Sequence, residues 1–132
     1  MTVASRKVNI ADPDKLAKIM QKILANEEEN DRKKEHLWSI GVDAHTKIQY
    51  VELVALGTLN ACLVHPREVF RLAIKKAVAA VFIAHNHPSG NAMPSAEDKA
   101  VTKRLKDAGN LIGIEVVDHL IITPRDYSSI LH

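Results

Sequence analysis

Residues 80–90 read AVFIAHNHPSG, an apolar stretch that runs into two histidines, a proline and a glycine. The first five of these residues have the length and composition of a short strand that is buried on both faces of a sheet. Pro88 has no backbone N–H for a neighbouring strand, so we expect the strand to end before it. This stretch therefore predicts a buried strand that carries two histidines at its end.

The segments around this strand alternate between strand and helix patterns. Residues 36–42 and 47–56 are rich in β-branched and aromatic side chains, and the polar turn between them predicts a β-hairpin. Residues 95–110 place their apolar side chains at helical spacing. The order of these elements predicts an α/β (α+β) fold in a single domain, with a mixed β-sheet flanked by helices. The other expected elements are a helix that opens at Pro66, a strand over 114–123 and a closing helical turn over 126–131.

The first third of the chain predicts one amphipathic helix and a polar connector. Asp12 and Pro13 have the residue types of an N-cap and of a first helical position. The apolar residues that follow form one stripe, which needs a partner surface in the chain's own core or on another subunit. Residues 26–34 are almost wholly polar and form either the exposed end of that helix or a linker. We expect residues 1–34 to precede a domain over 35–132.

Composition and charge exclude several classes of protein. The chain has 132 residues, 46% hydrophobic and 26% charged, which is the balance of a globular domain rather than of a disordered chain. Its 18 basic and 16 acidic residues nearly balance, giving a net charge of +2. This balance argues against a protein whose main role is to cover phosphate backbones. The N-terminus lacks the apolar core of a secretory signal, and the longest apolar run is too short to span a membrane. We therefore expect a cytoplasmic protein.

Two histidines and an aspartate have the arrangement of a metal site. His85 and His87 stand at positions i and i+2 of the expected strand, where alternate side chains point to the same face. Asp98 follows in the first turn of the next helix, after a loop short enough to return its carboxylate to the two imidazoles. These groups are ligands for a first-row metal, of which zinc is the usual occupant, and three protein ligands leave a fourth position for water. One cysteine, Cys62, excludes a multi-cysteine site.

Each of these residues also has an ordinary structural interpretation. The two histidines could be incidental side chains at a solvated strand end. Ser95 and Asp98 have the spacing of a capping box, which would fix the start of the helix. A cap and a metal ligand are compatible in one residue, because the cap would hold the helix that presents the carboxylate. Short motifs recur by chance, so spacing alone does not decide between the two interpretations.

A water on such a metal needs a base that takes its proton and passes it to the leaving group. Glu52 is the first candidate, because it lies in the middle of a strand between apolar neighbours and must face either solvent or a site. Glu35, at the start of the first hairpin strand, is the weaker alternative. The ordinary interpretation of Glu52 is a polar residue on an exposed face of the sheet.

Several separated motifs resemble one family of proteins. His85-x-His87-Pro88, followed after six residues by Ser95-x-x-Asp98, resembles the JAMM (JAB/MPN+) metalloprotease motif. The similarity to the RadC-like JAB domain of bacteria runs from about Glu35 to Leu131. The segments that carry this similarity, in chain order, are Gly57-Thr58-Leu59-Asn60, His65-Pro66-Arg67-Glu68-Val69-Phe70, His85-Asn86-His87-Pro88-Ser89-Gly90, Pro94-Ser95-x-x-Asp98 and Asp118-His119-Leu120-Ile121.

The resemblance implies a cytidine deaminase-like fold and a JAMM-type zinc metallopeptidase that cuts a peptide or isopeptide substrate. It implies that His85, His87 and Asp98 bind Zn²⁺. It also implies that Glu52, just upstream of the Gly57 segment, is the general base, and that Ser95 donates to the oxyanion of the tetrahedral intermediate. His65 and His119 belong to the similar segments but receive no role. RadC-like proteins usually carry an N-terminal helix-hairpin-helix region, which residues 1–34 do not show.

Two functions of other classes compete with the hydrolase. The first is a non-catalytic RadC-like module that acts in DNA repair or binds protein or DNA. It is motivated by the family's association and by a basic helix face (Lys99, Lys103, Arg104, Lys106), although a solvated surface is the commoner explanation of such a face. The second is a nucleobase deaminase, which would need a Cys-x-x-Cys pair and is excluded by the single cysteine. The sequence identifies neither the substrate nor whether the chain forms a homo-oligomer.

Overall fold

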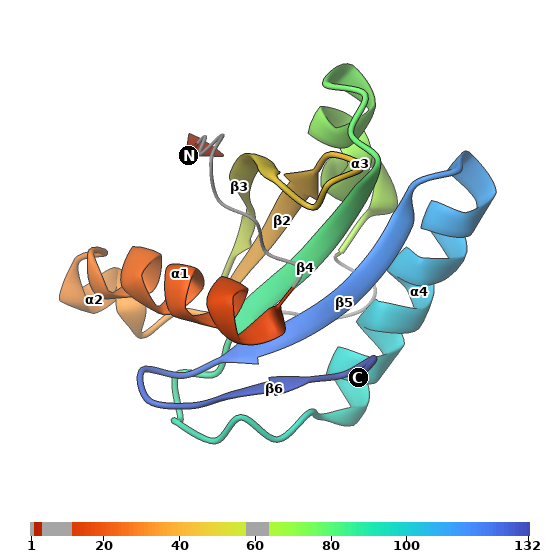
Figure 1. Cartoon of the computed structure of the whole chain (residues 1–132). Helices are drawn as coiled ribbons and strands as arrows, with labels where there is room; N and C mark the ends of the chain where they lie inside the picture. The colour runs from red at the N-terminus through yellow and green to blue at the C-terminus, as the bar shows by residue number, and fades with distance from the viewer. Residues whose placement is uncertain (1, 4–11, 58–63) are drawn as a thin grey trace.

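A computed structural model describes residues 2–3, 12–57 and 64–132, which form one six-stranded sheet with helices on both faces (Figure 1). The strand order is β1-β3-β2-β4-β5-β6. β4 and β5 run parallel and the other neighbouring pairs run antiparallel, which confirms the predicted mixed sheet. The strands are β1 (Thr2–Val3), β2 (His36–Val42), β3 (Ile48–Leu56), β4 (Ala80–Asn86), β5 (Glu115–Ile122) and β6 (Tyr127–Ser129). The helices are α1 (Pro13–Ala25), α2 (Glu29–Arg32), α3 (Pro66–Lys75) and α4 (Ala96–Ile112).

β4 lies inside the sheet between β2 and β5, and all of its residues are buried. This confirms the prediction of a strand that is covered on both faces. Phe82 and Ala84 pack in the core on the α1 side, and Val81 and Ile83 pack in the core on the side of α3 and α4. Because side chains alternate along a strand, His85 continues the second set and faces α4.

The apolar stripe of α1 packs in the chain's own core, which was one of the two expected partner surfaces. Leu16 and Met20 are fully buried against strand residues that include Trp38. Asp12 caps the helix by accepting a hydrogen bond from the backbone N–H of Asp14, as the sequence predicts. Residues 13–25 therefore share one core with the sheet that carries the histidines.

α3 and α4 cover the other face of the sheet. Phe70 of α3 and Leu105 of α4 are buried in one cluster with the β4 side chains Val81 and Ile83. α4 begins after its N-cap Ser95 and ends at Gly113, whose φ of +79° gives the left-handed C-terminal turn that glycine adopts without strain. No helix in the described ranges is both long enough and apolar enough to cross a membrane.

A glycine in β2 makes room for an aromatic ring of β3. A Cβ atom at Gly41 would lie 2.0 Å from Cε2 of Tyr50, which is fully buried. The Tyr50 hydroxyl lies 3.1 Å from Oγ of Ser39, and this hydrogen bond fixes the position of the ring over β2. The close approach of ring to backbone therefore requires glycine at this position.

Two segments differ from the sequence prediction. Residues 26–34 contain the separate short helix α2, so they are neither a continuation of α1 nor a plain linker. The prediction of a helical turn over 126–131 is wrong, because Tyr127–Ser129 pairs with β5 as strand β6. The buried carboxylate of Asp118 accepts hydrogen bonds from Oγ of Ser129 and the backbone N–H of Leu131, which fastens this segment to β5. β1 was also not predicted, and it pairs Thr2 with Glu52.

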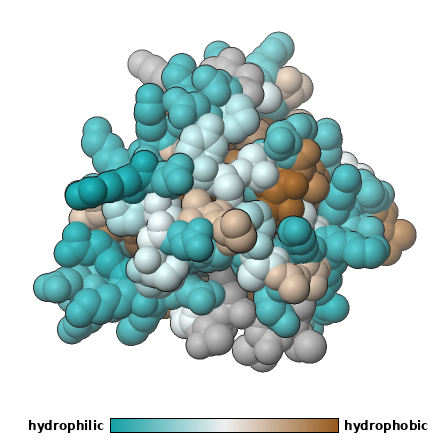
Figure 2. Space-filling view, turned by 90° about the horizontal axis from the view of Figure 1, so that it is seen from below, coloured by the Kyte–Doolittle hydropathy of each residue, from teal (hydrophilic) through white to brown (hydrophobic). Residues whose placement is uncertain are grey.

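The surface is largely polar. Figure 2 shows one face, on which hydrophilic residues predominate and apolar residues gather in small areas. The predicted motif residues Thr58, Leu59 and Asn60, and the single Cys62, lie outside the described residues. The large apolar side chains that are exposed in the described part of the chain are Leu56, Ile74, Met93, Leu111 and Ile112.

Candidate metal centre

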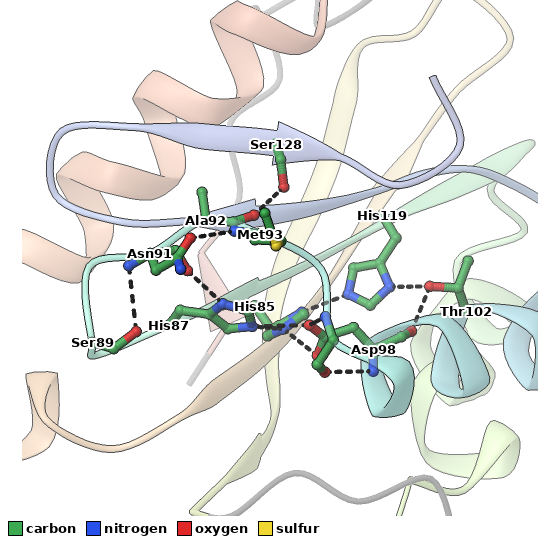
Figure 3. A network of polar contacts seen from close by, with 11 residues as sticks. His85, His87, Ser89, Asn91, Ala92, Met93, Asp98, Thr102, His119 and Ser128 are labelled. Atoms are coloured by element: carbon green, nitrogen blue, oxygen red, sulfur yellow. Dashed lines mark hydrogen bonds and ion pairs between the residues drawn. The ribbon is translucent and has the colours of Figure 1, made fainter.

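Three ligand groups converge at the end of β4, where it meets the first turn of α4 (Figure 3). Nε2 of His85 lies 2.9 Å from Oδ1 of Asp98, and Nε2 of His87 lies 3.0 Å from Oδ2 of the same residue. The two Nε2 atoms are 3.0 Å apart. The structure thus brings together the three residues that the sequence predicts as metal ligands, and this group could hold a metal ion.

The spacing of these donors fits a tetrahedral ion. Ligand atoms bound at about 2.0–2.1 Å in tetrahedral geometry are separated by about 3.3–3.4 Å. The observed separations of 2.9 and 3.0 Å fall only a few tenths of an ångström short of that value. Imidazole nitrogens and carboxylate oxygens are also the donor types that first-row metals bind in proteins. The chemistry of the donor set therefore fits a bound metal.

The loop after β4 fixes the orientation of the His87 ring. Nδ1 of His87 lies 2.8 Å from the carbonyl oxygen of Asn91. Because a carbonyl oxygen can only accept, Nδ1 carries a proton and neutral His87 has its lone pair on Nε2, toward Asp98. The loop turns through Gly90, whose φ of +87° favours glycine, and Ser128 of β6 donates from Oγ to the carbonyl of Ala92. The loop is thereby held against β6.

Asp98 is a helix cap and a member of the candidate site at once. Its backbone N–H donates to Oγ of Ser95 at 3.1 Å, and its Oδ2 accepts from the backbone N–H of Ser95 at 2.7 Å, which completes a capping box. Burial raises the pKa of Asp98, but hydrogen bonds from the His85 ring and from Ser95 outweigh it and hold the pKa well below its usual range. The carboxylate is therefore ionised at neutral pH, as a metal ligand requires.

A buried chain of polar groups lies behind His85 (Figure 3). Nδ1 of His85 is 2.6 Å from Nε2 of His119, and Nδ1 of His119 is 2.6 Å from Oγ1 of Thr102. Burial, followed by the nearby charge of His85, holds the pKa of His119 well below its usual range. His119 has no role that could be predicted from the sequence. Its signal was a histidine directly before the apolar run of residues 120–122, but its partner can be found only from the pairing of β4 with β5.

A cleft of about 660 Å³ opens beside this group, with His87 and Asp98 in its wall. Ser95 lines it, and because the cap uses its Oγ as an acceptor, the hydroxyl proton can be donated to a group in the cleft. Two lysines at the same cleft make ion pairs within the chain, Lys33 with Glu29 and Lys34 with Asp31. The other residues that line the cleft are Glu35, Gly57, His87, Pro88, Ser89, Glu97 and Asp98.

Glu35 is brought to the ligands by the pairing of β2 with β4. Leu37 of β2 lies opposite His85 of β4, and Glu35 comes directly before the first residue of β2. Glu35 therefore enters the sheet beside the end of β4 that carries the two histidines. This placement agrees with the position of Glu35 in the wall of the cleft.

The central residue of the His-Asn-His motif clamps the backbone on both sides of Glu35. Oδ1 of the buried Asn86 accepts a hydrogen bond from the backbone N–H of His36, and its Nδ2 donates to the carbonyl oxygen of Lys34 at 3.0 Å. The carbonyl oxygen of Glu35 accepts from the backbone N–H of Gly57 at 2.8 Å. The amide of Asn86 therefore ties the start of β2 to the end of β4, a role the sequence analysis missed.

Glu52 lies away from this group. Its Oε2 accepts from Nη2 of Arg71 at 2.6 Å, and among the described residues its buried Oε1 has no hydrogen-bond partner. Glu52 pairs with Ser39 of β2, and Ser39 pairs with Ile83 of β4. Glu52 is therefore two strands away from β4, at the level of the residue that lies two positions before His85. Strand geometry makes this a separation of about 10 Å across and about 7 Å along the sheet. The structure does not bring Glu52 to the three ligands, and its role as general base stays a prediction.

Two of the four residues on the basic face of α4 make contacts within the chain. Lys103 pairs with Asp107 at 2.9 Å, and Nε of Arg104 donates to the carbonyl oxygen of Val64 at 3.1 Å. Arg104 therefore contributes to packing between α4 and the segment that precedes α3. Lys99 and Lys106 are exposed.

Comparison with known proteins identifies relatives of the chain. A family model of the RadC-like JAB domain matches residues 10–132. A UPF0758 protein of Listeria welshimeri is 50% identical over 96 residues, which cover 73% of this chain and 43% of the relative. A UPF0758 protein of Symbiobacterium thermophilum is 52% identical over 88 residues, which cover 67% of this chain and 38% of the relative. The match thus spans less than half the length of these curated relatives. The chain belongs to the RadC-like JAB domain family.

Proposed function

We propose that this chain is a zinc-dependent amide hydrolase of the JAMM class, acting as a metallopeptidase or isopeptidase. The observation that carries the proposal is the convergence of two imidazole nitrogens and one carboxylate beside an open cleft. Zinc is the metal that best suits two nitrogens and one oxygen in tetrahedral arrangement. Three protein ligands leave one position for water or substrate, which is typical of a catalytic rather than a structural site.

The residues around the cleft have distinct roles in this proposal. His85, His87 and Asp98 would hold the ion. When bound, zinc lowers the pKa of a coordinated water to about 7 and polarises the carbonyl of the substrate. Ser95 would donate its hydroxyl proton to the oxygen on which negative charge develops, while its Oγ continues to cap α4.

We assign the transfer of protons to Glu35 rather than to Glu52. Glu35 lines the cleft, and Asn86 at the end of β4 holds the backbone of Lys34 and His36 on either side of it. Its carboxylate would take a proton from the attacking water and deliver it to the nitrogen of the leaving amine. Glu52 is instead engaged by Arg71. The assignment therefore rests on the order of the strands, which makes β2 and not β3 the neighbour of β4.

Replacing each glutamate by glutamine tests this assignment. We expect Glu35→Gln to lower the rate of amide hydrolysis by about 10²–10⁴-fold, because glutamine keeps the shape but cannot accept the proton. The bound zinc should remain, since Glu35 is not a ligand. The measurement uses a mixture of fluorescence-quenched peptides and a lysine-isopeptide-linked peptide, with metal content determined in parallel.

Glu52→Gln is the matched control. It should retain most of the hydrolytic rate and lose stability through the broken ion pair with Arg71. If Glu35→Gln hydrolyses amides at the full rate and Glu52→Gln is inactive, then Glu52 and not Glu35 is the general base. If the unaltered chain binds zinc but cleaves none of these amides, the proposed reaction is wrong for these substrate classes.

A further inference from the structure

Thr102 sets the direction of the polar chain behind His85. Its Oγ1 lies 2.8 Å from the carbonyl oxygen of Asp98, one turn earlier in α4, and 2.6 Å from Nδ1 of His119. A carbonyl oxygen can only accept, so the single hydroxyl proton of Thr102 points to Asp98. The lone pairs of Oγ1 then face His119, and Nδ1 of His119 must carry a proton and donate it to Thr102.

The proton on Nδ1 of His119 in turn fixes the position of a proton on His85. With its proton on Nδ1, neutral His119 presents a lone pair at Nε2, 2.6 Å from Nδ1 of His85. Two lone pairs at that distance would repel, so Nδ1 of His85 carries a proton and donates it to His119. Nε2 of His85 lies 2.9 Å from Oδ1 of Asp98. With the other ring proton fixed on Nδ1, Nε2 is the nitrogen whose lone pair a metal ion would take in place of the proton shared with Asp98.

We propose that His119 is a positioning residue that keeps the proton of His85 on Nδ1 and so offers Nε2 to the metal. The inference rests on the proposed function in that a metal ion is the ligand at Nε2. Ring nitrogens that bind metals are usually oriented by a hydrogen bond from the other nitrogen of the ring. His87 donates from its other ring nitrogen to a backbone carbonyl oxygen, whereas His85 donates to a side chain, which substitution can replace.

Packing alone does not account for a histidine at position 119. The residue is fully buried, and Ile121, the next residue on the same face of β5, is buried and apolar. A polar ring in such a place carries a cost of desolvation that a leucine would avoid. Both ring nitrogens of His119 are used, one toward Thr102 and one toward His85. The polar ring is therefore explained by the hydrogen bond that it accepts from His85.

Two substitutions of His119 separate the hydrogen bond from the packing. Leucine fills the space and removes the acceptor, so we expect His119→Leu to weaken zinc binding by about 10–100-fold. Glutamine restores an acceptor oxygen near the position of Nε2, so we expect His119→Gln to bind zinc nearly as well as the unaltered chain. The dissociation constant is measured by competition with a chromophoric chelator, and thermal unfolding confirms that each variant is folded.

Ile121→Val is the matched control for a change in packing. Ile121 is buried in the same strand and lies opposite His85 in the β4–β5 register. Loss of one methyl group there should leave the zinc dissociation constant unchanged. A folded His119→Leu variant with unchanged zinc affinity overturns the proposal, and so does a His119→Gln variant that is weakened as much as the leucine variant.

Nuclear magnetic resonance of the metal-free protein gives a readout that needs neither zinc nor activity. Nδ1 of His85 should show a hydrogen-bonded ring N–H proton in long-range ¹H–¹⁵N spectra. We expect this signal in the unaltered chain and in the His119→Gln variant, and we expect its loss in the His119→Leu variant. Absence of this signal in the unaltered chain would overturn the inference. Failure of the unaltered chain to bind zinc would instead defeat the proposed function, while the same signal would still establish the direction of the hydrogen bond.

Discussion

The His85→Ala, His87→Ala double variant is expected to lose its zinc entirely. The unaltered chain should hold about one zinc ion, because two imidazoles and one carboxylate complete the protein's share of a catalytic site. Removing both imidazoles leaves Asp98 as a single ligand. Elemental analysis of protein that has been supplied with zinc and then dialysed measures the change directly. A double variant that retains one zinc per chain would place the metal elsewhere.

Asp98→Asn refines this experiment, because Asp98 both caps α4 and belongs to the ligand group. Asp98 is the third helical residue of the capping box, and the side-chain carbonyl oxygen of asparagine can still accept from the backbone N–H of Ser95, but it lacks the negative charge. We therefore expect zinc to be lost with little change in thermal stability. Ser95→Ala is the converse control, since it removes an acceptor of the cap and keeps the carboxylate. It should cost about 0.5–2 kcal/mol of folding free energy and retain zinc.

Gly41→Ala is expected to produce the largest loss of stability, about 3 kcal/mol. The new Cβ would lie 2.0 Å from the Tyr50 ring, which is buried and cannot move without leaving the core. The backbone on the other side of the contact is held in the β2–β4 ladder, where Gly41 pairs with Val81. Denaturant unfolding, followed by the fluorescence of Trp38, measures the change in free energy.

A double-mutant cycle with Tyr50→Leu identifies the cause of this loss. If the clash with the ring is responsible, Gly41→Ala should cost much less in the Tyr50→Leu background than in the unaltered chain, since leucine can adopt a rotamer that leaves the space above position 41 open. Equal costs in both backgrounds would assign the loss to the backbone of β2 instead. The cycle requires that Tyr50→Leu itself folds, which the same unfolding experiment shows.

Local sequence signals were sufficient for the parts of the fold that depend on neighbouring residues. β2 has the bounds predicted from its β-branched and aromatic residues, and α4 begins after Ser95 because its cap lies within four residues of sequence. The grouping of His85, His87 and Asp98 could be predicted for the same reason. His85 and His87 share a strand face, and a short loop returns Asp98 to them.

The parts that sequence analysis missed depend on which strands become neighbours. The hairpin was predicted, but not that β2 rather than β3 lies beside β4, and this order brings Glu35 to the cleft and leaves Glu52 outside it. His119 reaches His85 only through the parallel register of β4 and β5. β6 forms because Asp118 and the edge of β5 provide partners that local propensity does not contain.

The double use of Asp98 links the lifetime of a bound ion to the fraying of a helix. First turns of helices open locally at a small fraction of the free energy of global unfolding. Each opening of the first turn of α4 would break the capping box and withdraw the carboxylate from both histidines. The rate of metal release would then follow the opening rate of that turn. Any ligand in the adjoining cleft that suppresses fraying would slow the escape of the ion, so occupancy by substrate and retention of metal would reinforce each other.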